Sequence, residues 1–178
     1  MGQYYMVYTK RNGREKVYNR YVDKQYTMAK LMEHSWWRNP FVNTMCYKIH
    51  HKPTQVAWVG DYVEKEEFEP YERVWGDNAK TYGVTEAQVV LDEKYLVNHT
   101  KKEYVDCNAY YERNVIKDKW CVHPLPLLTV IGNGRGGGDY CSEYGADFVG
   151  TWCNDLISVE EKAPKTYKEI SPTFKEEW

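Results

Sequence analysis

The chain has 178 residues and a formal net charge of −2 at pH 7, with 24 lysines and arginines against 26 aspartates and glutamates. This length suits one domain with a core of its own, and the near-neutral balance argues against a general nucleic-acid binder, which would carry a basic face. No apolar run approaches the roughly 20 residues of a membrane helix, and the first residues lack the pattern of a signal peptide, so we expect a cytoplasmic protein without a membrane partner.

The first half of the chain predicts a β-hairpin, a helix and a further strand. The strands are expected over residues 3–9, 15–21 and 56–59. Asn12-Gly13 separates the first two, and this dipeptide is a strong hairpin signal. Residues 27–37 fit either a helix or a strand. Asn39 followed by Pro40 has the pattern of an N-cap and a first helical position, which predicts a helix over residues 40–50.

The second half predicts further short strands and a charged end. The strands are expected over residues 95–97, 104–106, 119–122, 125–131 and 148–159. Residues 64–73 are acidic and predict an exposed connection, whereas residues 85–91 carry only a weak pattern. Several strands with one or two helices indicate an α+β fold. We expect one domain over residues 1–159 with a mainly antiparallel sheet, and a charged C-terminal arm over residues 160–178.

The five cysteines do not suggest a disulfide framework or a zinc site. Their number is odd, they are widely spaced, and none forms a Cys-x-x-Cys pair. Free and mostly buried thiols are the simplest expectation.

Six motifs together resemble a family of uncharacterised proteins from bacterial, phage and large-virus genomes. They are MGQYY (1–5), LMEHSW (31–36), WVGDY (58–62), YLVNHTKKEYVD (95–106), HPLPLLT (123–129) and GNGRGGGDY (132–140). The resemblance extends to about Ser158. It implies one intact domain and a phage-borne origin, but it brings no assigned activity and no catalytic residues.

The run Gly132–Tyr140 is the most informative stretch, because five of its nine residues are glycine. Such a loop is either a tight structural turn or a cradle in which backbone N–H groups and Arg135 hold an anion. Its spacing formally matches the dinucleotide fingerprint, but the following residues do not predict the helix that a Rossmann site requires. In the structural alternative, Arg135 pairs with Asp139.

Two Trp-x-x-Asp pairs offer rings that could stack on a base and carboxylates that could accept hydrogen bonds from ribose hydroxyls. They are Trp58/Asp61 and Trp152/Asp155, and each pair ends a predicted strand. The alternative is that the tryptophans are core rings and the aspartates cap turns. Whether the two pairs share a pocket stays open.

Glu33-His34-Ser35 places polar groups beside Trp36, although adjacent residues seldom face one another as a catalytic triad must. His34 is a candidate acid, base or ligand donor. The histidines lack metal-binding spacing. A metal would need distant residues such as His34, Asp61, Asp139 and His123, and we predict neither a metal nor a cofactor.

The leading hypothesis is non-enzymatic binding of an anionic, nucleotide-like small molecule, as by a phage protein that sequesters a nucleotide immune signal. Arg135 and the loop amides would hold phosphate, and a tryptophan would stack the base. The predicted ligand-binding residues are Asn133, Gly134, Arg135, Gly136, Gly137, Asp139, Tyr140, His34, Trp36, Trp58, Asp61, Trp152 and Asp155.

Two alternatives stay open. One is a hydrolase or phosphodiesterase-like enzyme acting on a nucleotide or related phosphate compound. Its catalytic residues would come from His34, Asp61 and Asp139, with His123 and Asp155 as further candidates. The other is a protein-interaction module that uses the tyrosine-rich surface or the charged arm. A homo-oligomer is compatible with all three.

Overall fold

A computed structural model describes residues 1–178 except 23–24, 86–93, 142, 144 and 177–178. The described strands form one sheet in the order β10-β7-β6-β9-β4-β1-β2-β3, with β5 added beside β2 and β8 beside β4. Their bounds are β1 Tyr5–Arg11, β2 Arg14–Val22, β3 Gln25–Thr27, β4 Thr54–Gly60, β5 Thr81–Thr85, β6 Tyr95–Asn98, β7 Glu103–Asp106, β8 Val130–Ile131, β9 Asp155–Glu160 and β10 Lys168–Glu169. Most pairings are antiparallel, and β2–β5, β4–β8 and β7–β10 are parallel.

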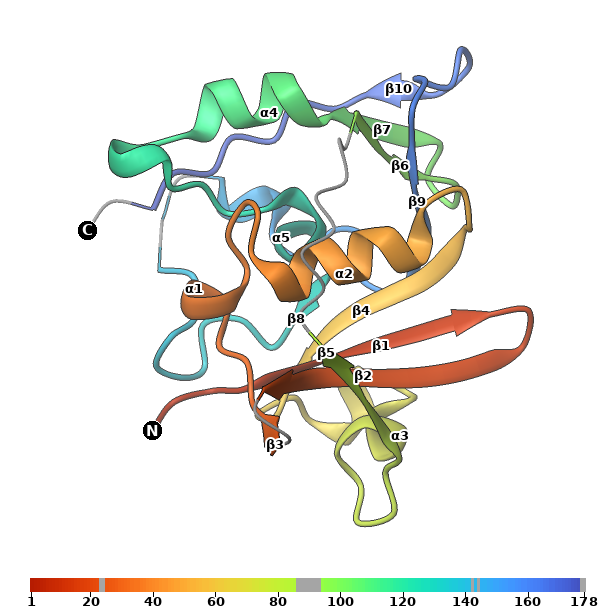
Figure 1. Cartoon of the computed structure of the whole chain (residues 1–178), viewed down its shortest axis with the longest axis vertical. Coiled ribbons are helices and arrows are strands. Elements are labelled where there is room, and N and C mark those ends of the chain that lie inside the picture. Colours follow the sequence, from red (N-terminus) through yellow and green to blue (C-terminus); the bar gives the residue numbers. More distant parts are fainter. Residues whose placement is uncertain (23–24, 86–93, 142, 144, 177–178) are drawn as a thin grey trace.

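The helices lie mainly against one face of this sheet (Figure 1). They are α1 Leu31–His34, α2 Pro40–Ile49, α3 Tyr71–Trp75, α4 Cys107–Asn114 and α5 Pro124–Thr129, with short 3-10 turns at Lys65–Glu67, Lys117–Lys119 and Ala146–Phe148. Only α2 and α4 exceed two turns among the described residues. The α+β fold with a mainly antiparallel sheet is therefore confirmed. No helix in the described part of the chain is long and apolar enough to span a bilayer.

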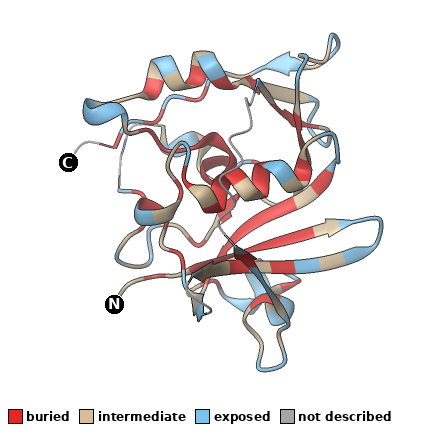
Figure 2. Cartoon of the chain, viewed as in Figure 1, coloured by how far each residue is buried: buried red, intermediate tan, exposed pale blue. Residues whose placement is uncertain are grey.

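The central strands β1 and β4 are buried on both faces, because alternate residues of a strand point to opposite sides. Tyr5 and Val7 join the main core under α2 and α5, which also holds Trp58. Met6 and Tyr8 face a second, smaller cluster with α3. Figure 2 shows buried residues along β4 and on the facing sides of α2 and α5. These two layers of packing hold the C-terminal end of β4. β8 pairs with β4 at that end and leads directly into the glycine loop.

The early elements agree with the sequence. Asn12 and Gly13 both adopt positive φ, as a two-residue hairpin turn requires. Asn39 caps α2 by accepting a hydrogen bond from the N–H of Phe41 at 3.0 Å. The predicted hairpin of 95–97 and 104–106 is present as β6 and β7. The ambiguous stretch 27–37 contains the single turn α1, and residues 86–91 lie outside the described part.

Three predicted strands are wrong in whole or in part. Residues 119–122 follow the end of a 3-10 turn and form only an isolated bridge, at Val122. Residues 125–131 form α5 and only two strand residues, because His123 caps the helix by accepting from the N–H of Leu125 at 3.0 Å. The last strand begins at Asp155 and not at residue 148, since a 3-10 turn and further turns precede it. The predicted connection 64–73 is mostly exposed, as expected, but it also contains the start of α3 and buries Phe68 in the smaller cluster.

The C-terminal residues pack on the domain. β10 pairs with β7, Phe174 is 1% exposed, and its N–H donates to Asn114 Oδ1 at 2.7 Å. The division into a domain of 1–159 and an arm of 160–178 stays a prediction.

Candidate functional site

The glycine loop is built around a carboxylate of its own. Asp139 Oδ2 accepts hydrogen bonds from the backbone N–H groups of Gly134, Arg135 and Gly136 at 2.8, 2.9 and 3.0 Å. Its Oδ1 accepts from the Tyr5 hydroxyl at 2.7 Å, and the side chain is almost fully buried. The loop therefore has the form of an anion-binding nest that an internal anion fills, and an external phosphate would have to displace Asp139.

Other residues of the loop are held by hydrogen bonds that involve main-chain groups. Gly137 exchanges hydrogen bonds with the N-terminal segment, donating to Met1 O and accepting from the N–H of Gln3. Asn133 Oδ1 accepts from the N–H of Tyr140 at 2.8 Å. Gly136 is required by close approach, because a Cβ there would lie 2.5 Å from Gln3 Cβ. These contacts favour the structural interpretation of the loop.

Arg135 points away from the nest and binds Glu67, which precedes α3. The two terminal guanidinium nitrogens, Nη1 and Nη2, each donate to one carboxylate oxygen, and Nη1 also donates to the carbonyl of Tyr62 at 2.9 Å. The Arg135 guanidinium holds the pKa of Glu67 at about 2, so this bidentate pair persists until the pH falls to about 2. The predicted Arg135–Asp139 side-chain pair is wrong, because Asp139 meets the backbone of residue 135 instead.

Asp61 lies near the loop but is part of a backbone anchor. Its Oδ1 accepts from the N–H of Tyr4 at 3.1 Å, and its own N–H donates to Tyr4 O. Burial raises the pKa of Asp61, and the negative charge of Asp139 raises it further. The two carboxylates thus share one neighbourhood, with Tyr5 bound to one of them.

His34 and Trp36 lie at the end of α1, which packs on the loop through the Ser35 and Tyr140 hydroxyls, 2.7 Å apart. Both ring nitrogens of His34 have partners: Nδ1 accepts from the N–H of Lys30, and Nε2 lies 2.6 Å from Arg20 Nη1. The half-buried Trp36 donates its indole N–H to Glu33 O. These contacts explain the local structure of α1 without a ligand.

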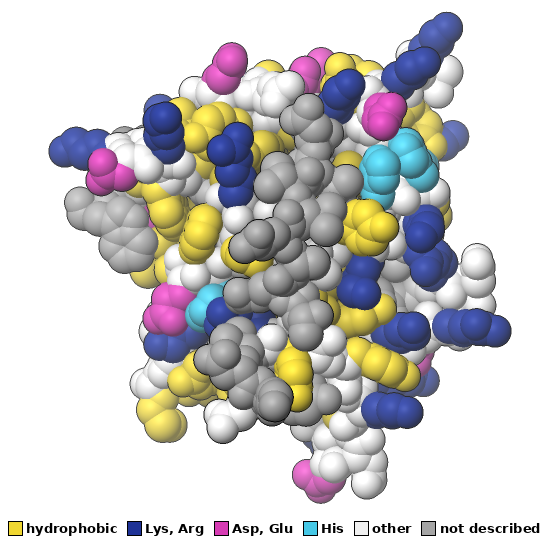
Figure 3. Space-filling model, in the orientation of Figure 1, with side chains coloured by type: hydrophobic (Ala, Val, Ile, Leu, Met, Phe, Trp, Pro, Cys, Tyr) yellow, Lys and Arg dark blue, Asp and Glu magenta, His cyan; other side chains and the backbone are white. Residues whose placement is uncertain are grey.

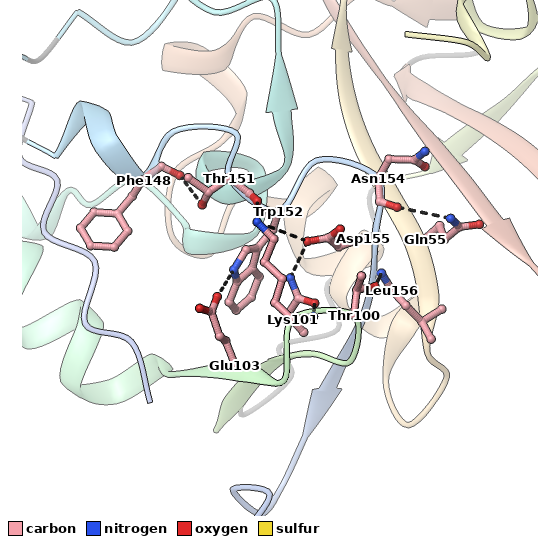
Figure 4. A network of polar contacts seen from close by, with 11 residues as sticks. Gln55, Thr100, Lys101, Glu103, Phe148, Thr151, Trp152, Asn154, Asp155 and Leu156 are labelled. Atoms are coloured by element: carbon pink, nitrogen blue, oxygen red, sulfur yellow. Dashed lines mark hydrogen bonds and ion pairs between the residues drawn. The ribbon is translucent and has the colours of Figure 1, made fainter. Parts of the chain in front are cut away.

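The two Trp-x-x-Asp pairs do not converge. Trp58 and Trp152 are both fully buried in the main core. Asp155 pairs with Val56 across β4–β9. Val56 lies five positions before Asp61, which corresponds to about 16 Å along a strand. Figure 4 shows Trp152 and Asp155 fastening the start of β9 to the β6–β7 hairpin, through Glu103 and Lys101.

A basic groove lies on a different part of the molecule. It is a cavity of about 680 Å³ between the β1–β2 hairpin and the C-terminal end of α2, and Tyr18 and Tyr47 contribute rings to its wall. Its cations are Arg11, Arg14, Lys16, Lys48 and Lys52. In the part of the chain that the structure describes, no carboxylate lines it or forms an ion pair with these five side chains. Figure 3 shows lysine and arginine side chains gathered beside the hairpin.

Lys48 packs against an aromatic ring in the wall of the basic groove. Its Nζ lies 4.8 Å from the centre of the Tyr18 ring, a cation–π arrangement. Burial lowers the pKa of Lys48, and the positive charges of Lys16 and Arg11 lower it further. A bound anion would raise the pKa of Lys48 again, because it would supply the counter-charge that the described residues do not.

The sequence did not predict this groove. Its cations come from two separate segments, and their local excess of positive charge does not show in the net charge of the whole chain. The distant metal-ligand set of His34, Asp61, Asp139 and His123 does not form a donor cluster among the described residues. No protein-family model, curated protein sequence or solved structure matches the chain, so its function is inferred from the geometry of its own sites.

Proposed function

We propose that this protein binds an anionic, nucleotide-like small molecule in the basic groove, without transforming it. The observation that carries the proposal is the set of five cationic side chains around one cavity in a chain whose net charge is −2. Like charges repel, so gathering them costs free energy unless an anion is bound. The glycine loop is not the phosphate site in this proposal, because its amides hold Asp139.

The dimensions and the aromatic groups favour a nucleotide over a simple anion. A volume of about 680 Å³ lies within the range of roughly 300–1,000 Å³ that small-molecule sites occupy. Arg11 and Arg14 supply planar donors that suit phosphate oxygens. Tyr47 is 55% exposed, and a base can stack on such a ring.

The proposed biological use combines this groove with the phage-borne origin that the family resemblance implies. A phage protein with this groove would act in the host cytoplasm and hold a nucleotide signal of host immunity out of reach of its receptor. Binding alone suffices for that role, and it requires neither a metal nor a catalytic residue.

The test is a two-step assay with mono-, di- and cyclic nucleotides and ADP-ribose derivatives. Each is incubated with the protein, and the free nucleotide is quantified by chromatography before and after heat denaturation. We expect one class to disappear from solution and to return intact. Conversion to a new product would replace the proposal with the hydrolase alternative. An unaffected panel would favour a protein-interaction module.

Variants locate the site within the same assay. Lys16→Ala/Lys48→Ala should weaken retention at least about tenfold, since each phosphate contact with a charged donor contributes about 1.5–3 kcal/mol. The matched control is Lys117→Ala/Lys165→Ala, which removes two exposed lysines elsewhere. Arg135→Ala should retain the ligand as wild type does. If Arg135→Ala abolishes retention and the groove variant does not, the ligand lies at the glycine loop.

A further inference from the structure

We propose that His50, His51 and Glu161 form a binding site for a divalent transition-metal ion, for which Zn²⁺ is the best chemical fit. One potential ligand atom from each of the three lies within 4.8 Å of the other two. Two imidazole nitrogens and one carboxylate oxygen are a donor set that zinc accepts in sites with an open coordination position. Magnesium and calcium instead favour oxygen donors throughout. The proposal rests on other observations than those that define the basic groove, although His50 and His51 lie in sequence between Ile49 and Lys52, which line that groove.

The backbone brings the three donors together from two elements. His50 is the C-cap of α2, and His51 follows it with a φ of 53°. The N–H of His51 donates to Val159 O in β9 at 3.1 Å, and Glu161 directly follows β9. His51 is one of seven described non-glycine residues with a positive φ, a conformation that histidine adopts more readily than most residue types. Here it turns the second ring back beside the first, with ring centres 3.9 Å apart.

Glu160 orients His51 for metal binding. Its Oε2 lies 2.6 Å from His51 Nδ1, and its Oε1 accepts from the Ser158 hydroxyl at 2.7 Å. With the Nδ1 proton donated to this carboxylate, the Nε2 lone pair of His51 is available to an ion. A carboxylate that holds the second nitrogen of a ligating histidine is the usual support of such sites.

The charge and exposure of the cluster also suit a cation. His51 and Glu161 are exposed, so an ion can reach them. Glu160 and Glu161 supply two negative charges, which offset those of a divalent ion. The competing explanation is a surface ion pair between a protonated His51 and Glu160, and an exposed pair of that kind contributes little stability. Only the metal site predicts saturable binding of an ion.

The experiment measures Zn²⁺ binding by the full, tag-free chain in competition with a chromophoric chelator. We expect one ion per chain. His50→Ala, His51→Asn and Glu161→Gln should each weaken binding at least about tenfold, and Glu160→Gln about tenfold through His51. Asn is chosen at position 51 because it tolerates positive φ. The controls His34→Gln and Glu112→Gln remove an imidazole and a carboxylate elsewhere and should bind as wild type does.

Co²⁺ provides a second readout, since its visible absorption reports nitrogen ligands and low coordination number. We expect this spectrum for wild type and its loss in the His50→Ala/His51→Asn variant, with circular dichroism showing that the variant is folded. If wild type binds no ion at micromolar Zn²⁺, or if the double variant binds as tightly as wild type, the proposal is overturned.

Discussion

At the scale of single residues, Asp139 determines whether the glycine loop can bind an external anion. Its carboxylate occupies the position at which a phosphate would sit in a loop of exposed amides, and it also receives the Tyr5 hydroxyl. The glycines of this loop therefore allow two parts of the backbone to pack closely, as Gly136 does against Gln3. The same residue types in a ligand-binding loop would leave those N–H groups pointing at solvent.

Replacing Asp139 should strongly destabilise the fold. In Asp139→Ala, three backbone donors and one hydroxyl lose a buried charged acceptor, so we expect the free energy of unfolding to fall by about 3 kcal/mol or more. Asp139→Asn, which keeps an acceptor oxygen, should lose less. Urea unfolding measures both, with the exposed Asp147→Asn as control. An Asp139→Ala chain as stable as the control would show that the loop is not organised by this carboxylate.

At the scale of secondary-structure elements, the packing of the C-terminal segment depends on one glycine. Gly145 adopts a φ of 80°, and a Cβ there would lie 1.6 Å from Thr173 O, beside the buried Phe174. Phe174 packs edge-on against Tyr140, which follows Asp139. The tail and the glycine loop are thus parts of one packed unit.

Gly145→Ala should displace this segment. Gly13 is a matched control, because its φ is 72° but a Cβ there meets nothing within 4 Å. We expect Gly13→Ala to cost about 1–2 kcal/mol from backbone strain alone, and Gly145→Ala at least about 2 kcal/mol more through lost packing of Phe174. Thermal unfolding measures the difference, and limited proteolysis should remove the tail only in Gly145→Ala. Equal losses in both variants would contradict the contact with Thr173.

Elements with strong local signals could be predicted from the sequence, and those decided by a cap or a distant partner could not. Asn39-Pro40 and His123-Pro124 both begin helices, but only asparagine is a common N-cap, so α5 resembled a short apolar strand. The site shows the same limit. The cations of the basic groove and the three proposed metal ligands, two histidines and a glutamate, carry no distinctive pattern in sequence, and only the pairing of β1, β4 and β9 brings them near each other.

At the scale of the whole molecule, the sheet joins segments that are far apart along the chain. β4 pairs with β1 and β9, β6 pairs with β9, and the parallel partners of β2 and β7 are also distant in sequence. Each such pairing requires a long loop to close before any contact compensates for the lost entropy. Chains of this kind fold slowly, over about milliseconds to seconds, so stopped-flow refolding should show tryptophan fluorescence changing on that timescale. A newly made chain would then expose its central strands for that whole interval, and β1 and β4, both buried on two sides in the finished fold, would be the segments most prone to aggregate.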